Sequence, residues 1–209
     1  MQKDRDIPVS GKQLKGILAI PENPIGMILF SHGSGSGRFS PRNQFVAEVL
    51  QKAHFATLLV DLLTEEEDEI YENRFDIDLL TQRLIEITHW LISQEATKKL
   101  NIGLFGASTG AAAALKCSAK DKSIIKAVVS RGGRPDLAMP VLSHVNSPVL
   151  LLVGGDDTDV IVLNKQAYAV LTGVKKLEII PGATHLFEEP GALESVAELA
   201  RDWFLRYLS

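Results

Sequence analysis

The strongest chemical signal in the sequence is the pentapeptide GASTG at residues 106–110, which has the form G-x-S-x-G. An apolar run at residues 102–105 precedes it, and an alanine-rich segment follows it. In this strand–turn–helix setting the pattern is typical of a nucleophile elbow, where a tight turn lifts the serine hydroxyl above a sheet and glycines flank it. Ser108 is therefore the candidate nucleophile. An ordinary glycine-rich turn, with Ser108 as the helix N-cap, is the alternative interpretation.

A serine becomes a nucleophile when a base removes its proton and an acid orients that base. After an elbow of this kind the acid and then the histidine follow along the chain. His185 lies in the loop 182–187, after an apolar run, and is the candidate base. Asp157 is the preferred acid, because the loop 154–160 has the form G-x-x-D-x-x-V. Asp156 and Asp159 remain alternatives, with helix capping as their other role.

The oxyanion formed by such a nucleophile needs two hydrogen-bond donors. The backbone N–H of Thr109, the residue after the nucleophile, is expected to be one. The second is expected from the loop 31–38, SHGSGSGR, whose glycines permit close backbone approach. The N–H of Ser34 is the first choice and that of Gly33 the second. The loop lacks the G-K-[ST] ending of a P-loop, so we predict no nucleotide site there.

Four basic residues are candidates for binding substrate, namely His32, Arg38, Arg131 and Arg134. The arginines suit a substrate carboxylate or phosphate, and Arg42 lies near the same loops. Pairing with acids such as Asp136 or the run 65–69 is the alternative for them. His32 precedes the nucleophile in the chain and is interpreted as a residue that structures its loop. The remaining histidines, His54, His89 and His144, lie in or beside predicted helices and are interpreted as surface or packing residues.

Short apolar runs alternate with segments of helical spacing, and this alternation predicts an α/β domain with a mostly parallel sheet and helices on both faces. The predicted strands are residues 13–20, 27–31, 55–60, 102–105, 125–130, 148–153 and 175–181. The predicted helices are residues 43–52, 77–93, 109–120, 160–171 and 193–208. In such a sheet, ligands bind beyond the carboxyl ends of the strands, where the candidate residues all fall. No cap domain is predicted, and loops such as 62–75 are the only expected roof.

Composition narrows the classes of protein. The 209 residues suit a single domain, taken as residues 1–209, with 45% hydrophobic and 23% charged residues. A net charge of −4 argues against nucleic acid as a partner. One cysteine, Cys117, excludes a disulfide framework within the chain and a multi-cysteine zinc site. No apolar run is long enough for a membrane span, and the polar residues 1–8 do not resemble a signal peptide, so a cytoplasmic location is expected.

The sequence resembles the α/β-hydrolase superfamily, and within it the small capless dienelactone hydrolase-like group. The stretches that carry the resemblance are SHGSGSGRFSPRN, GASTGAAAAL, SRGGRPDLA, LLLVGGDD and PGATHLFEEPGALE. The resemblance implies a Ser108–Asp157–His185 triad that acts on an ester or related acyl bond of a small molecule, with no metal and no organic cofactor. Members that give the group its name carry a cysteine where this chain has Ser108. This difference favours a carboxylesterase-type activity.

Overall fold

The central strands form from short apolar runs because helices cover both of their faces. The structure is a computed structural model that describes residues 2–209, and residue 1 of the predicted domain lies outside the described residues. The strands are β1 (Gln2–Val9), β2 (Lys12–Ala19), β3 (Gly26–Ser31), β4 (Phe55–Val60), β5 (Ile102–Ala107), β6 (Ile125–Arg131), β7 (Val149–Gly154) and β8 (Lys175–Ile180). In β3, β4, β5 and β7 every residue is buried, as the apolar runs predict.

All eight described strands belong to one sheet, in the order β1-β2-β4-β3-β5-β6-β7-β8. The six strands β3 to β8 pair in parallel with one another. β1 and β2 form an antiparallel hairpin at one edge, and β2 pairs antiparallel with β4. Because the parallel strands point the same way, the loops that follow them all meet at the carboxyl edge of the sheet. The order and the direction of the strands define the α/β-hydrolase fold expected from the sequence.

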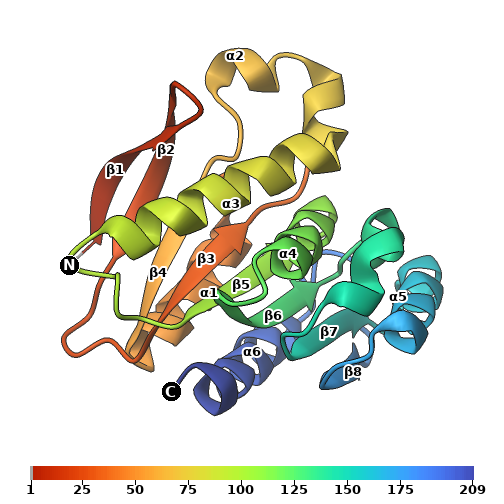
Figure 1. The fold of residues 1–209 in the computed structure, drawn as a ribbon. Helices are drawn as coiled ribbons and strands as arrows, with labels where there is room; N and C mark the ends of the chain where they lie inside the picture. Colours follow the sequence, from red (N-terminus) through yellow and green to blue (C-terminus); the bar gives the residue numbers. More distant parts are fainter. Residues whose placement is uncertain (1) are drawn as a thin grey trace.

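Helices cover both faces of the sheet, which therefore lies between two separate apolar cores. The helices are α1 (Pro41–Lys52), α2 (Glu65–Asp68), η1 (Tyr71–Phe75), α3 (Ile77–Ser93), α4 (Thr109–Lys120), η2 (Pro135–His144), α5 (Thr158–Val170) and α6 (Ala192–Leu208). Figure 1 shows α3 crossing one face with α4 next to it, and α5 at the far end of the sheet near β7 and β8. The opposite core is formed by α1 and α6. Within residues 2–209, no helix combines the length and apolar character that a bilayer crossing requires.

The structure contains four elements that the sequence prediction lacks, namely β1, α2, η1 and η2, and the first two have a clear local cause. The polar segment at the N-terminus forms β1, because its Ile7 and Val9 side chains are buried while the alternate positions face solvent. The acidic run 65–69 is predicted as a solvated loop, but most of it forms α2. A capping box explains this helix: the Glu67 N–H donates to Thr64 Oγ1 at 3.3 Å, and the Thr64 N–H donates to Glu67 Oε2 at 3.0 Å.

Candidate active site

Ser108 stands at the turn between β5 and α4 in a conformation that few non-glycine residues adopt, with φ of 50° and ψ of −122°. Its backbone N–H donates to the carbonyl of Arg131 at 3.1 Å, and its carbonyl accepts the Arg134 N–H at 3.1 Å. The side chain makes no capping hydrogen bond to α4. Ser108 therefore does not act as the N-cap that an ordinary strand–helix turn would use, and its hydroxyl is left at the carboxyl edge of the sheet.

Two glycines make this turn sterically feasible. A Cβ atom at Gly106 would lie 2.5 Å from the Cα of Ala111 in the first turn of α4. A Cβ atom at Gly110 would lie 2.3 Å from the carbonyl oxygens of both Ser31 and His32. These are backbone atoms that cannot move aside as a flexible side chain would. The glycines at both ends of G-x-S-x-G thus allow α4 to begin directly against β3.

His185 and Asp157 come together at the same edge, from the loops after β8 and β7. His185 Nδ1 and Asp157 Oδ2 are 2.6 Å apart, a short hydrogen bond in which the ring N–H donates to the carboxylate. The Asp157 side chain is 15% exposed and the His185 side chain 38%. Asp157 occupies the N-cap position of α5 but does not cap it, since its carboxylate contacts the imidazole instead. The structure brings Asp157, and not Asp156 or Asp159, to His185.

Gly132, which the sequence analysis leaves aside, forms part of the surface that supports the histidine. Its φ is 52°, and a Cβ atom there would lie 3.4 Å from His185 Cε1. Gly132 follows Arg131, whose carbonyl anchors Ser108, so the elbow and the imidazole flank the same strand end. No hydrogen bond joins Ser108 Oγ to His185 Nε2 in the described structure. Such bonds are often long in unliganded enzymes and shorten when substrate binds.

The loop after β3 lies against the elbow. A Cβ atom at Gly33 would be 3.0 Å from Ser108 Cβ, and the Ser34 N–H donates to Thr109 Oγ1 at 2.9 Å. The predicted oxyanion donor on Ser34 is thus close to the elbow, but its N–H already has an internal acceptor. The N–H of Thr109 opens α4, where backbone donors lack an intrahelical partner. Ser34 and Thr109 therefore adjoin one another, as the oxyanion-hole prediction requires.

His32 is 8% exposed and uses both ring nitrogens within the protein. Its Nδ1 donates to the carbonyl of Gly33 at 2.9 Å, and its Nε2 accepts the Leu62 N–H at 3.0 Å. Burial lowers the pKa of this imidazole, although the Gly33 carbonyl and the charges of Asp61 and Asp68 oppose that shift. A neutral His32 that joins two loops matches the interpretation of a loop-structuring residue.

The three candidate arginines have different surroundings. Arg38 forms an ion pair with Asp61 and lines a hollow of about 400 Å³ between the β1–β2 hairpin and α2, to which no triad residue contributes. Arg134 binds Asp136 through two parallel bonds of 2.9 and 2.8 Å, which raise the pKa of its guanidinium. Arg131 is 8% exposed and forms no ion pair in the described residues. Pairing with an acid therefore holds for Arg38 and Arg134 but not for Arg131.

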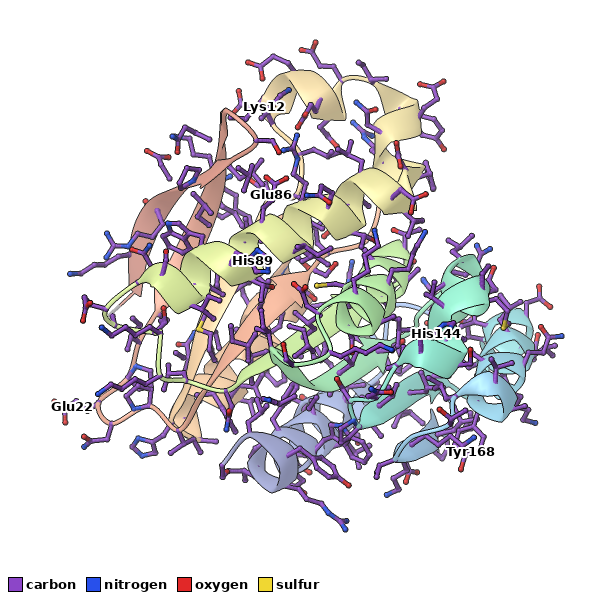
Figure 2. All side chains as sticks on the ribbon, viewed as in Figure 1. Lys12, Glu22, Glu86, His89, His144 and Tyr168 are labelled. Atoms are coloured by element: carbon purple, nitrogen blue, oxygen red, sulfur yellow. The ribbon has the colours of Figure 1, made fainter. Side chains whose placement is uncertain are left out.

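The remaining histidines and the cysteine lie away from this edge or are not free to react. Figure 2 shows His89 on α3 and His144 at the end of η2. His89 Nε2 lies 3.2 Å from Asp121, and His54 Nδ1 contacts the Glu22 carbonyl at 3.1 Å. Cys117 is buried inside α4, where burial raises the pKa of its thiol to about 12. Within residues 2–209, no three His, Cys, Asp or Glu side chains gather in an arrangement that could hold a metal ion.

Comparisons with known proteins identify the family of this chain. A profile of the dienelactone hydrolase family matches residues 14–209, so the chain belongs to that family. A solved structure of a dienelactone hydrolase from Anabaena variabilis is 53% identical, covers 100% of this chain and 99% of its own, and has a TM-score of 0.97. Fold and family together define a member of the dienelactone hydrolase family with the α/β-hydrolase fold.

Two further comparisons set the range of the similarity. Est1E from Butyrivibrio proteoclasticus is 17% identical, covers 97% of this chain and 98% of its own, and has a TM-score of 0.84, a likeness in fold alone. Two Mycobacterium tuberculosis proteins, provisionally named phosphoribosyl transferases, are 55% identical over 202 residues, or 97% of this chain. The chain spans 44% of the length of these relatives.

Proposed function

We propose that this protein is a serine hydrolase that cleaves a carboxylic ester or related acyl bond of a small molecule. The observation that supports it most is the 2.6 Å bond between His185 Nδ1 and Asp157, at the edge where the strained Ser108 presents its hydroxyl. A carboxylate on Nδ1 fixes the tautomer that leaves Nε2 as a base. No metal or organic cofactor is part of the proposal.

In the proposed mechanism Ser108 Oγ attacks the acyl carbonyl carbon while its proton passes to His185 Nε2. The carbonyl oxygen becomes an oxyanion, held by the backbone N–H groups of Thr109 and Ser34. The tetrahedral intermediate expels the alcohol, which takes its proton from the imidazolium. Water, deprotonated by His185, then attacks the acyl carbonyl carbon. The bond to Ser108 Oγ breaks, the serine oxygen takes back the proton from the imidazolium, and the acid is released. Asp157 stabilises the imidazolium throughout without accepting its proton.

Labelling with a fluorophosphonate probe, followed by mass spectrometry of the modified peptide, tests the proposed nucleophile. We expect a single adduct on Ser108 in the wild-type protein and none in S108A or H185A. D157N should label at least about a hundredfold more slowly, because the imidazole loses its orienting charge. D156N is the matched control, since Asp156 is the adjacent acid and makes no contact with His185. Wild-type labelling rates in D157N, or an adduct elsewhere, would contradict the assignment.

Turnover of p-nitrophenyl esters and of a dienelactone then defines the reaction class. Transfer of the acyl group to an added alcohol or to peroxide, in preference to water, would favour an acyltransferase or a perhydrolase on the same triad. A folded protein that neither reacts with the probe nor turns over an ester would favour a binding module on a hydrolase scaffold.

The name of the mycobacterial relatives raises phosphoribosyl transfer as a second candidate. We assign that activity to none of the residues of this chain, because the chain spans 44% of those relatives and matches a hydrolase structure over its full length. Incubation with a phosphoribosyl donor and a nucleobase should release no pyrophosphate. Pyrophosphate release by the wild-type protein that persisted unchanged in S108A would reverse this assignment, since it would be independent of the proposed nucleophile.

A further inference from the structure

Arg131, the last residue of β6, is a buried cation without a partner. Its residue exposure is 8%, and both Nε and Nη1 are buried without a hydrogen bond. Buried charges in proteins are normally paired, because removing an ion from water is costly. Arg83, which is similarly buried, follows this rule through a 2.8 Å bond to Glu67. Arg131 does not, so the guanidinium has hydrogen-bonding capacity that the chain itself leaves unused.

The surroundings of Arg131 add positive charge instead of neutralising it. Burial, together with the nearby charge of Arg42, lowers the pKa of Arg131 to about 10. Arg42 is the second residue of α1, a helix of 12 residues whose N-terminus carries a partial positive charge. The Nε of Arg42 is also buried without a partner, while its Nη1 bonds at 3.0 Å to Glu188. Glu188 is 63% exposed, so this ion pair lies on the solvent side of Arg42.

We propose that Arg131 and Arg42, at the N-terminal end of α1, form a binding site for one oxyanion, the phosphate or carboxylate group of a small molecule. Such a group accepts hydrogen bonds from guanidinium N–H groups and supplies the negative charge that this part of the protein lacks. Anion binding at these arginines is a property separate from the proposed hydrolysis, and it can be measured without turnover of an ester.

The location connects this anion site to the candidate active site. The Arg131 carbonyl accepts the Ser108 N–H, and the next residue, Gly132, packs against His185. The backbone of Arg131 is therefore bonded to the elbow, and the residue that follows it packs against the histidine loop. The Arg42–Glu188 ion pair joins the segments after β3 and β8 on the outer side of the same site.

Thermal unfolding in the presence of inorganic phosphate, succinate or chloride, at one fixed ionic strength, tests the site. We expect phosphate or succinate to raise the Tm of the wild-type protein above its value in chloride, and the better anion identifies which group the site takes. R131M should show no anion-specific rise, which corresponds to an affinity at least about tenfold weaker. In chloride, R131M should be as stable as the wild type, because the substitution removes an unpaired buried charge. R134M, which loses a paired arginine, should respond to the anions as the wild type does.

A second pair of variants separates anion binding from the surface ion pair. R42Q and E188Q both remove the Arg42–Glu188 ion pair, but only R42Q removes a positive charge from the site. R42Q should therefore weaken the response to anions and E188Q should not. An equal response in wild type and R131M, or no response to either anion in the wild type, would overturn the proposal. Because no ester is hydrolysed in these measurements, S108A should respond as the wild type does, whatever the outcome of the labelling experiment.

Discussion

Thr109 takes part in the site through two different atoms. Its backbone N–H is a proposed oxyanion donor, and its Oγ1 accepts the N–H of Ser34, the second proposed donor. In the unliganded protein the threonine hydroxyl therefore occupies the position on Ser34 that an oxyanion would take. When the oxyanion forms, the Ser34 N–H exchanges a neutral acceptor for an anionic one. Its contribution to catalysis is therefore only the difference in free energy between these two hydrogen bonds.

Replacement of Thr109 by valine tests this exchange. T109V keeps the shape of the side chain and removes the competing hydroxyl, so Ser34 donates to the oxyanion alone. We expect kcat/KM for a p-nitrophenyl ester to stay within about threefold of the wild-type value or to rise. T109S, which retains a hydroxyl, is the control. A loss of two orders of magnitude in T109V but not in T109S would mean that the hydroxyl itself serves the reaction.

At the residue scale, the types and the order of Ser108, Asp157 and His185 can be predicted because the chemistry demands them. Asp156 and Asp157 are adjacent in the loop after β7, and the motif G-x-x-D-x-x-V favours Asp157. The isolation of Arg131 could not be predicted in this way. Whether an arginine meets an acid depends on side-chain direction at a strand end: the neighbouring Arg134 binds Asp136, while Arg131 is buried without an ion-pair partner.

At the scale of elements, the junction of β5, α4 and β3 depends on Gly110. G110A would place a methyl group 2.3 Å from two carbonyl oxygens of the β3 end, so α4 must shift or β3 must bend. We expect a loss of about 3 kcal/mol in the free energy of unfolding, measured with urea, and loss of probe labelling at Ser108. G173A is the matched control, because the nearest atom to its Cβ is 3.4 Å away. Wild-type stability and labelling in G110A would contradict this description of the junction.

The hydrophobic pattern of the sequence predicts some elements of this fold and fails to predict others. The strands β3, β4, β5 and β7 are continuous apolar runs buried on both faces, and such runs differ clearly from the amphipathic helices between them. β1 is an edge strand with mostly polar residues, defined by its pairing with β2 and by the burial of Ile7 and Val9. α2 is four residues long, and its cap on Thr64 outweighs the mutual repulsion of an acidic run. Short or edge elements depend on contacts that a local pattern does not contain.

At the scale of the whole molecule, Glu67 joins three segments that are far apart in sequence. Its carboxylate lies 2.8 Å from Lys12 on β2 and 2.8 Å from Arg83 on α3. Figure 2 shows Lys12 at the tip of the hairpin, beside α2. Burial alone would raise the pKa of Glu67, but Lys12, the Thr64 backbone and Arg83 together hold the pKa below its usual value. The ionised form of this residue is thus stabilised by folding.

This lowered pKa gives a prediction with a definite sign. The ionised Glu67 stabilises the fold above the unfolded-state pKa, and that contribution disappears as the pH falls through the lower, folded-state pKa. E67Q should therefore be less stable than the wild type at pH 7, by roughly 1–3 kcal/mol, because Arg83 loses the charge of its buried partner. The difference should shrink in acid, as measured by urea unfolding over a pH series. E65Q, on the exposed side of α2, should match the wild type, and a pH-independent deficit in E67Q would contradict the electrostatic origin.

The positive φ of Ser108 has a consequence for how this chain would respond to selection. A serine in that conformation carries a steric cost, of order 1 kcal/mol, that glycine would not. The junction holds the serine there regardless, because β3, β5 and α4 leave the backbone no other path. The folded protein would thus be more stable with glycine at this position, without the hydroxyl that we propose as its nucleophile. A search for heat-resistant variants that ignored turnover would favour glycine at position 108 and so remove the nucleophile that we propose.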